Sequence, residues 1–519
     1  MPKPAESRWG ILLLAVAVFS SVALMIPFLS AGPLTLDEHC SYWLIESDVP
    51  STILERSLTE AAIPPLSAWF QWCLIQIGGR NELMLRLGSA IPYVLAIPVM
   101  FRLGKDLGGS MVGGISCLIL AWHPEAMDEV RIGRCYGLMI LLSAVSFLVT
   151  VRWLKSPSRW SDAILWGLIG GALLWTHYLT APVLAVQLVV LLGLIRIGST
   201  ASRPPLMHLA AGVLIVVALG VPLVPSVIRM AEWNSAFGFG QQPTPLWELF
   251  GPIWVVGLCV GLVIGKLVTG RSFSKPSEVN SRHALVVLLV WGLAPLVMMA
   301  VVTHLGMPGL NNPRYRVAFA VPGACCLALL LVRYHSPVGA AVGAVALLIA
   351  AWSLETHRVW QPGRVSGVER FHWREIALTI ERDGQPGEPV FVQSGLMEGF
   401  LVPQFFNDPL FMDYVACRVS KFYLPSFHPR YALPFLWNGG TPLIDYYRTL
   451  IGQHGDQSRA VWVACATDTD LCRNSLPAMH LLLSEAGYQL VDRQTHSTAE
   501  LVRYELREGR KVLPSDATR

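Results

Sequence analysis

Charged residues are scarce in this sequence. Only 14% of its 519 residues are Asp, Glu, Lys or Arg, while 53% are hydrophobic, and the mean hydropathy is +0.50. A soluble globular protein averages about 25% charged residues. This composition excludes an ordinary soluble domain and predicts a polytopic membrane protein. The net charge of +4 indicates no nucleic-acid partner.

Several common site motifs are missing as well. The sequence contains no CxxC pair, no zinc-type spacing, no P-loop and no GxGxxG after a predicted strand. Most of the ten cysteines are scattered through apolar segments, where Cys behaves as a small hydrophobic residue. Cys465 and Cys472 bracket the sequence ATDTDL, and this spacing fits either a disulfide or two free thiols. The sequence therefore contains no nucleotide-binding or zinc-binding motif that would indicate a function.

Long apolar runs are abundant instead. The first, from Ile11 to Gly32, follows Lys3 and Arg8 and so resembles a signal peptide. Its apolar part is about 20 residues, longer than a signal h-region, and no A-x-A-like site follows, so we interpret it as a retained transmembrane helix. Further runs lie at about 83–104, 108–123, 136–153, 161–178, 180–197, 206–227, 246–267, 283–303, 315–333 and 337–353. Because one crossing needs about 20 apolar residues, the sequence predicts about eleven transmembrane helices.

One more apolar stretch, Ile63 to Gly79, is ambiguous between a crossing and a helix at the membrane surface. The positive-inside rule favours the second, because the cation clusters then share one side with the N-terminus. These cations are Lys3, Arg8, Arg102, Lys105, Arg152, Lys155, Arg159, Arg196, Arg203, Lys266, Arg271, Lys275, Arg282 and Arg333. We therefore expect an interfacial helix with Trp69 and Trp72 at headgroup level, and an ordinary span stays as the alternative.

This topology gathers polar residues at the opposite, outer face. Asp37 and Glu38 follow the first helix there. The segments 123–137, 176–178 and 311–316 end at the same face and carry acidic, basic and aromatic-polar side chains. Ionisable groups close to a membrane usually line a pathway or a site, so the sequence places a site at this face.

Residues 354–519 differ in character from the rest of the chain. Short β-type runs lie at 388–393, 460–466 and 488–493, and a helical pattern lies at 476–487 between the last two. Strands alternating with helices predict a small α/β domain. An odd number of crossings from an inside N-terminus places this domain outside the cytoplasm. The expected organisation is a transmembrane module at 1–353, with a first outer loop at 32–82, and an extracytoplasmic domain at 354–519.

Several short motifs, taken in their order along the chain, resemble those of a known family. They are the pair Asp37–Glu38, Pro64–Pro65 before the interfacial helix, RLGSA at 86–90, RxxRxYG at 131–137, THY at 176–178 and PRY at 313–315. In this order they resemble GT-C glycosyltransferases over residues 9–330. The nearest groups are the bacterial dolichyl-phosphate-mannose-protein mannosyltransferase-like and aminoarabinose-transferase-like enzymes. One departure is AAIPP at 61–65, where several members carry a Lys or His before the interfacial helix.

The resemblance implies a polyprenyl-phosphate sugar donor in the bilayer and a hydroxyl acceptor on a protein, lipid or glycan at the outer face of the plasma (inner) membrane. Asp37 and Glu38 are the expected catalytic residues. A carboxylate suits the base that takes the acceptor's proton, and a desolvated cavity is expected to raise its pKa. The leaving phosphate needs cations, for which Arg131, Arg134, Arg314 and Arg316 are available. The other expected substrate-binding residues are Arg86, Asp128, Glu129, Tyr136, His177, Tyr178 and Tyr315. No cofactor is implied with certainty, and a divalent metal ion is left open.

Each of these residues also has a purely structural interpretation. Asp37 would serve well as the N-cap of the helix that follows, and Glu38 as a first-turn charge. Arg86 would only extend its charge to the membrane surface, and Asp128 and Glu129 would form a solvated face. The other candidates would be interface anchors: His177, Tyr178, Arg314 and Tyr315. His39 beside the acidic pair is poor support for a metal site.

The sequence leaves two other functions open. A transporter or lipid flippase is disfavoured, because no inverted repeat or matching pair of broken helices is visible. The other alternative is a non-catalytic scaffold whose outer domain binds a partner, and the intact acidic pair argues mildly against it.

Overall fold

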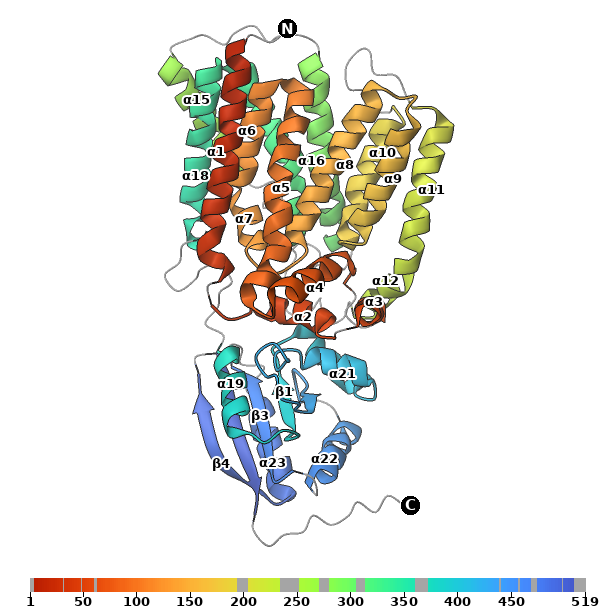
Figure 1. The fold of residues 1–519 in the computed structure, drawn as a ribbon, viewed down its shortest axis with the longest axis vertical. Coiled ribbons are helices and arrows are strands. Elements are labelled where there is room, and N and C mark those ends of the chain that lie inside the picture. The colour runs from red at the N-terminus through yellow and green to blue at the C-terminus, as the bar shows by residue number, and fades with distance from the viewer. Residues whose placement is uncertain are drawn as a thin grey trace.

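The computed structural model describes residues 4–30, 32–47, 49–59, 63–193, 204–233, 252–269, 280–304, 313–359, 372–437, 440–455, 458–467, 474–496 and 498–507. The chain forms an upright bundle of helices, with a smaller α/β domain at one end (Figure 1). Three short helices lie between the two parts.

The bundle is built from the predicted apolar runs. Its helices are α1 (Pro4–Leu29), α5 (Glu82–Gly108), α6 (Ser110–Ala121), α8 (Tyr136–Lys155), α9 (Trp160–Leu174), α10 (Ala181–Leu191), α11 (Leu206–Gly220), α15 (Pro252–Thr269), α16 (Asn280–His304), α17 (Ala320–Tyr334) and α18 (Pro337–Val359). Within the described ranges, seven helical stretches are long and apolar enough to cross a membrane, and four shorter apolar helices accompany them. The predicted polytopic helical fold is thus confirmed, with seven candidate spans in the described part of the chain, and the number of about eleven crossings stays a prediction.

Small residues let the bundle helices approach closely. A Cβ atom added at Gly137 would lie 1.8 Å from the carbonyl oxygen of Ser89, so α8 crosses α5 with almost no space between the backbones. A Cβ atom at Gly88 would lie 2.4 Å from the side chain of Gln71. The glycines of the RLGSA and RxxRxYG motifs therefore serve packing, and they bring the loop before α8 against α5 and the helix that contains Gln71.

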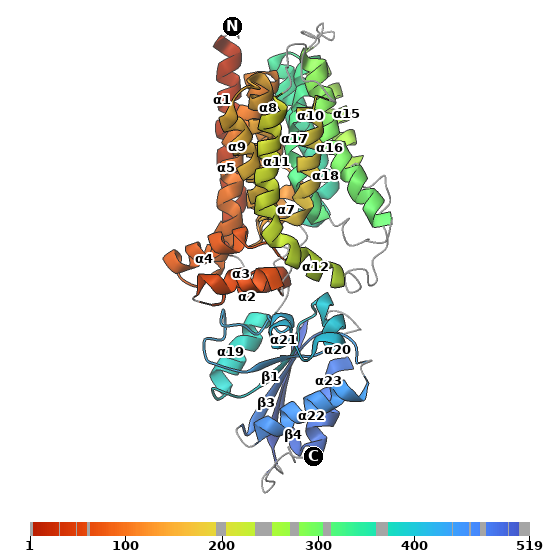
Figure 2. The same cartoon turned by 90° about the vertical axis from the view of Figure 1, so that its right-hand side faces the viewer.

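The three short helices cross the end of the bundle that faces the α/β domain (Figure 2). They are α2 (Leu36–Ile45), α3 (Pro50–Thr59) and α4 (Leu66–Gly78). The ambiguous stretch at 63–79 forms α4, which has 13 residues and lies outside the upright bundle. Its first amide, that of Leu66, donates to the carbonyl of Trp175 at 3.0 Å, and Trp69 stacks on Trp175. With 13 residues α4 is shorter than the about 20 that a crossing needs, and the interfacial position stays a prediction.

Shorter elements cap the same end of the bundle. They are α7 (Pro124–Val130), η1 (Tyr178–Thr180), η2 (Val221–Leu223), α12 (Val224–Glu232) and η4 (Pro313–Phe319). The opposite end, with the N-terminus, carries cations of α5 and α8. The ammonium of Lys155 lies 3.7 Å from the carboxylate of Asp106 there. The expected loop cations Lys3, Arg196, Arg203, Arg271 and Lys275 lie outside the described residues.

The C-terminal domain is the predicted α/β unit. Its helices are α19 (Trp373–Asp383), η5 (Met397–Leu401), α20 (Val402–Phe405), α21 (Pro409–Val415), α22 (Thr441–Gly455) and α23 (Ser475–Glu485). Its strands are β1 (Val390–Gln393), β2 (Arg430–Ala432), β3 (Ala460–Ala466), β4 (Tyr488–Thr495) and β5 (Ala499–Leu506). The sheet order is β2-β1-β3-β5-β4; β1 is parallel to β2 and β3, and β5 is antiparallel to β3 and β4. The sequence pattern had indicated β1, β3, β4 and α23 but neither β2 nor β5.

The hydrophobic core of this domain continues into α2. Trp43 and Cys40 of α2 belong to the same buried cluster as Phe411 and Trp373. Polar contacts reinforce the junction, since the Trp43 indole donates to Asp413 at 2.7 Å. The domain is therefore docked on the helix that carries the acidic pair. Cys465 is buried in β3, whereas Cys472 lies outside the described residues, so the predicted Cys465–Cys472 alternatives stay a prediction.

Candidate active site at the membrane exit

The helix that carries the acidic pair begins with a capping box. Thr35 is the N-cap of α2, and its hydroxyl accepts a hydrogen bond from the Glu38 amide at 3.2 Å. The Glu38 carboxylate in turn accepts from the Thr35 amide at 2.8 Å. This reciprocal pair is the T-x-x-E motif, which is visible as TLDE in the sequence. The N-cap alternative for Asp37 is therefore wrong, because Thr35 occupies that position.

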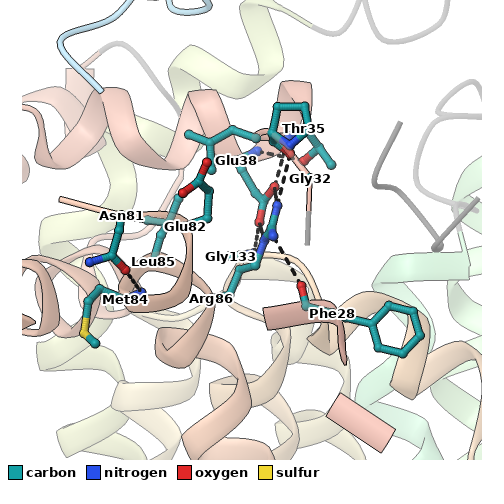
Figure 3. Close-up of polar contacts among 12 residues, drawn as sticks. Phe28, Gly32, Thr35, Glu38, Asn81, Glu82, Met84, Leu85, Arg86 and Gly133 are labelled. Carbon is teal, nitrogen blue, oxygen red and sulfur yellow. Dashed lines mark hydrogen bonds and ion pairs between the residues drawn. The ribbon is translucent and has the colours of Figure 1, made fainter. Parts of the chain in front are cut away.

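Glu38 and Arg86 form a buried, fully engaged pair (Figure 3). Nε and Nη2 of Arg86 donate to the two carboxylate oxygens at 2.7 and 3.1 Å, and the Gly133 amide donates to Oε1 at 2.8 Å. Arg86 also donates to the carbonyls of Phe28 and Pro33. The side chains are 0% and 1% exposed. Their hydrogen bonds join α2, α5, the end of α1 and the loop before α8, which favours positioning over the expected catalytic and substrate-binding roles.

Asp37 points away from this pair and meets two other arginines. Its Oδ2 accepts from Nη1 of Arg314 at 2.7 Å, while Nη1 of Arg134 donates to its backbone carbonyl at 3.1 Å and to Ser41 Oγ at 3.4 Å. The side chains of Asp37 and Arg314 are 34% and 28% exposed. Unlike Glu38, Asp37 is thus open to a ligand.

The acidity of Asp37 differs from the expected direction. Burial raises the pKa of Asp37, but the charges of Arg314 and Arg134 together outweigh it and hold the pKa below its usual value. The expected rise through desolvation is therefore wrong for this arrangement. The pKa of Asp37 is lowered because its ion pair stabilises the charged carboxylate more than burial disfavours it.

Glu129 of α7 behaves in the opposite way. Burial, together with the neighbouring charge of Asp128, raises the pKa of Glu129 to about 8. The charges of Asp37, Arg314 and Arg134 also act on Glu129, which places it in the same electrostatic environment. The site therefore contains one carboxylate that is charged at neutral pH and one that is mostly protonated. Such a pair with separated pKa values is typical of acid–base chemistry.

The four arginines expected to hold phosphate divide into two groups. Arg134 and Arg314 flank Asp37, as described. Arg316 lies 3.8 Å from Glu125, and the Arg131 guanidinium lies 3.7 Å from the ring centroid of Phe28. Arg131 is 2% exposed, and among the residues that the structure describes none accepts a hydrogen bond from its guanidinium nitrogens. A buried charge of this kind is suited to a bound anion.

Aromatic side chains form a group beside Arg314. The His177 ring lies between Tyr136 and Tyr315, with centroid distances of 6.3 and 5.3 Å. Burial, with the charges of Arg134 and Arg314, lowers the pKa of His177 to about 3, so this ring is neutral. Nη2 of Arg314 donates to the Tyr315 hydroxyl at 3.2 Å. Tyr178 does not belong to this aromatic group, because its hydroxyl donates a hydrogen bond to Ser226 Oγ of α12 at 2.5 Å.

The expected residues thus converge in part. We call the group Asp37, Glu129, Arg134, His177, Arg314 and Tyr315 the Asp37 site. Sequence reasoning missed Ser41 and also Glu398 of η5, on whose pKa the charges of Asp37 and Arg314 act. Glu398 is buried, accepts from the Tyr414 hydroxyl at 3.2 Å, and has a pKa that burial raises. Nothing local marked Glu398, because only docking of the C-terminal domain brings it here.

No metal cluster is evident in the described part of the chain. The side chains placed there contain no group of three or more His, Cys, Asp or Glu that could hold a metal ion. His39 is fully buried, and neither ring nitrogen has a described hydrogen-bond partner. Burial, with the charges of Arg418 and Arg430, holds the pKa of His39 well below its usual value, so it is a neutral core residue.

The architecture is similar to that of solved membrane glycosyltransferase structures. The structure of ArnT from Cupriavidus metallidurans in the apo state superposes with a TM-score of 0.60 at 13% identity, covering 96% of this chain and 98% of that one. The chain has the GT-C glycosyltransferase fold. The same ArnT bound to undecaprenyl phosphate gives a TM-score of 0.59 at 14% identity, with the same coverage. The apo oligosaccharyltransferase of Archaeoglobus fulgidus gives 0.53 at 13% identity, covering 94% of this chain and 74% of that one.

One sequence-family model also matches part of the chain. The family model described as dolichyl-phosphate-mannose-protein mannosyltransferase matches residues 62–224. A comparison with curated proteins gives no match. The matched region runs from just before α4 to the start of α12 and contains Arg86, Arg134 and His177, but neither Asp37 nor Arg314. The resemblance stated from the sequence motifs is confirmed, and nothing found supports a transporter or a scaffold.

Proposed function

We propose that this GT-C protein is a membrane glycosyltransferase that moves a hexosyl or pentosyl group from a polyprenyl-phosphate donor to a hydroxyl acceptor. The observation that carries the proposal is the partly open Asp37 carboxylate between Arg134 and Arg314, at the end of a bundle of apolar helices. A lipid-linked donor would keep its chain in the bilayer and present its sugar–phosphate bond at this depth. The similarity in fold to ArnT, solved with undecaprenyl phosphate, supports such a donor.

Asp37 is the proposed general base. The acceptor hydroxyl attacks the anomeric carbon, a new C–O bond forms, the sugar–phosphate bond breaks, and the hydroxyl proton passes to Asp37. General-base catalysis of this kind contributes about 10²–10⁴-fold to the rate. The carboxylate is already ionised because of Arg314, so it is ready to accept a proton, although the ion pair weakens its basicity.

Arg314 and Arg134 are the proposed holders of the leaving phosphate. Arginine presents a planar fork that matches phosphate oxygens. When a phosphate draws Arg314 away from Asp37, the Coulombic stabilisation of the carboxylate falls and its basicity rises. Donor binding would thereby activate the base. Arg131, with no described acceptor for its N–H groups, is a further candidate ligand for the oxygens of the donor phosphate.

Glu129 is the proposed neutral hydrogen-bond donor. With a pKa of about 8 it retains its proton at neutral pH, so it can approach an anionic phosphate without repulsion. Asp128, Tyr136, His177 and Tyr315 are proposed to line the sugar and acceptor side. Glu38 and Arg86 are positioning residues in this scheme, because their hydrogen bonds hold the start of α2 against α5.

The orientation proposed is a multi-pass protein of the plasma membrane with the Asp37 site and the C-terminal domain outside the cytoplasm. Cations at the opposite end of α5 and α8 support it through the positive-inside rule. Protein, lipid and glycan hydroxyls are all acceptable acceptors by this chemistry. The arginines supply positive charge for the leaving phosphate in this scheme, and a divalent metal ion stays open.

Sugar transfer by purified protein tests the proposal. Full-length protein in detergent is incubated with a panel of polyprenyl-phosphate hexoses and pentoses together with protein, lipid and glycan hydroxyl acceptors, and release of polyprenyl phosphate is followed by mass spectrometry. We expect release with at least one donor, and release that is about 10²–10⁴-fold slower with the Asp37→Asn variant. Intact donor with every sugar, under conditions where the donor measurably binds, would contradict a glycosyltransferase.

A further inference from the structure

Two cysteines meet at the junction between the first outer loop and the C-terminal domain. Cys40 belongs to α2, and Cys417 lies two positions after the last residue of α21. Their sulfur atoms lie 3.8 Å apart although 377 positions separate them in the sequence. Cys40 is 3% exposed and Cys417 0%, so the contact is fully enclosed. Spacing in the sequence gave no sign of this pair.

The backbones on both sides of the sulfurs are held in place. Nε1 of Trp43, one turn after Cys40, donates to Asp413 at 2.7 Å. Arg430 binds the carboxylates of Glu46 at 2.6 Å and Asp413 at 2.5 Å, and so joins α2 to α21 and β2. The two sulfurs therefore approach each other as part of a defined interface and not through mobile side chains.

We propose that Cys40 and Cys417 form a disulfide that fastens the C-terminal domain to α2. In the reaction both thiols lose a proton and an electron, and one S–S bond forms. The disulfide of a thiol–disulfide oxidoreductase accepts the two electrons and two protons and becomes a dithiol. The inference rests on the proposed orientation, because disulfides persist in extracytoplasmic compartments. Oxidation precedes final docking, since the docked sulfurs are enclosed.

The consequence of the bond concerns the Asp37 site. Cys40 lies three positions after Asp37 on the same short helix. Glu398, which shares the electrostatic environment of Asp37, belongs to the docked domain. A covalent link at Cys40 would keep α2 and this domain in one register while donor and acceptor exchange. The competing interpretation is two buried thiols that pack as small hydrophobic residues.

Thiol trapping distinguishes these interpretations. Cells are quenched with acid and N-ethylmaleimide before purification of the full chain, and peptides are mapped by mass spectrometry without reductant. We expect a linked Cys40–Cys417 peptide that disappears on reduction. The matched control retains Cys40 and Cys465, a second buried cysteine of the same domain, and has Cys417→Ser; it should give no link.

Thermal unfolding gives a second measurement that does not depend on activity. Reductant should lower the melting temperature of the wild type by several degrees and leave the Cys40→Ala/Cys417→Ala double variant unchanged. Two alkylated, unlinked thiols in the trapped protein would overturn the disulfide. An impermeant thiol reagent applied to a Gly79→Cys variant then shows whether the orientation fails with it. The Asp37→Asn variant should retain the link while inactive, which separates this inference from the proposed function.

Discussion

Replacing Asp37 by Asn should remove activity without unfolding the protein. Asn has nearly the same shape, and its side-chain oxygen can still accept a hydrogen bond from Arg314. Thr35, and not Asp37, caps α2, so helix initiation is unaffected. The side chain loses only its charge and its capacity to take a proton.

The structure sets the size of both effects. The Asp37–Arg314 pair is about one-third exposed on each side, and ion pairs of this kind contribute about 0.2–1 kcal/mol to stability. The rate should fall far more, by about 10²–10⁴-fold, because that is the usual contribution of a general base. The melting temperature should therefore stay within a few degrees of the wild type.

Glu38→Gln is the matched control, because the two carboxylates are neighbours in the sequence. It leaves Arg86 buried without its charge partner, a loss that costs about 3–5 kcal/mol. The capping box itself should survive, because Gln can also accept a hydrogen bond from the Thr35 amide. We expect this variant to unfold at a clearly lower temperature and to lose activity in proportion to the folded protein that remains.

Turnover and thermal unfolding of the two variants, measured in the same detergent, test the division of roles. The reasoning is refuted if Asp37→Asn turns over like the wild type. It is also refuted if Glu38→Gln is as stable as the wild type. In the first case Glu129, whose raised pKa suits a base near neutral pH, would replace Asp37 in the scheme.

The remaining predictions concern topology, phosphate and pH. A cysteine at Gly79 should react with an impermeant thiol reagent from outside in a background without competing thiols, and one at Lys155 should react only after membrane disruption; the reverse pattern would contradict the proposed orientation. Arg314→Ala should abolish turnover and Arg314→Lys should recover only part of it, because lysine lacks the bidentate fork; equal turnover of both with the wild type would exclude an arginine clamp at this position. Arg134→Ala should raise the donor KM without loss of folded protein, as measured by donor titration. Because the pKa of Glu129 is raised, the folded state keeps a proton that the unfolded state releases above about pH 4.5, and the contribution of Glu129 to stability is lost as the pH rises towards about 8. The melting temperature should therefore fall less steeply with pH over this range in Glu129→Gln than in the wild type. Equal slopes in the two proteins would contradict the pKa shift.

Hydrophobic runs were sufficient to predict the bundle, because each membrane helix satisfies its own backbone hydrogen bonds and needs only apolar side chains outside. The position of α4 was accessible only through charge, since its own 13 residues are as apolar as many spans. Strands β2 and β5 escaped prediction for different reasons. β2 has three residues, too few for a pattern, and β5 is defined by its pairing between β3 and β4.

The candidate site was predictable as a gathering of residues but not as a geometry. Loops ending at one face brought Asp37, Arg134, His177 and Arg314 together, as the topology indicated. The partners within the gathering were not predictable: Arg86 resembled a phosphate ligand until its contacts with Glu38 were known. The direction of the Asp37 pKa shift also depended on such contacts, because it is the balance of burial against two specific arginines.

The acidic pair shows that a local sequence motif can separate the roles of Glu38 and Asp37. In a capping box only the third helical position reaches back to the N-cap amide, and in TLDE that position is Glu38. The preceding residue projects about 100° away around the helix, because an α-helix has about 3.6 residues per turn. A carboxylate at that second position cannot join the cap and is left for another partner. The four letters TLDE therefore already assign Glu38 to the start of the helix and Asp37 to the space beyond it, where Arg314 and the proposed donor meet it.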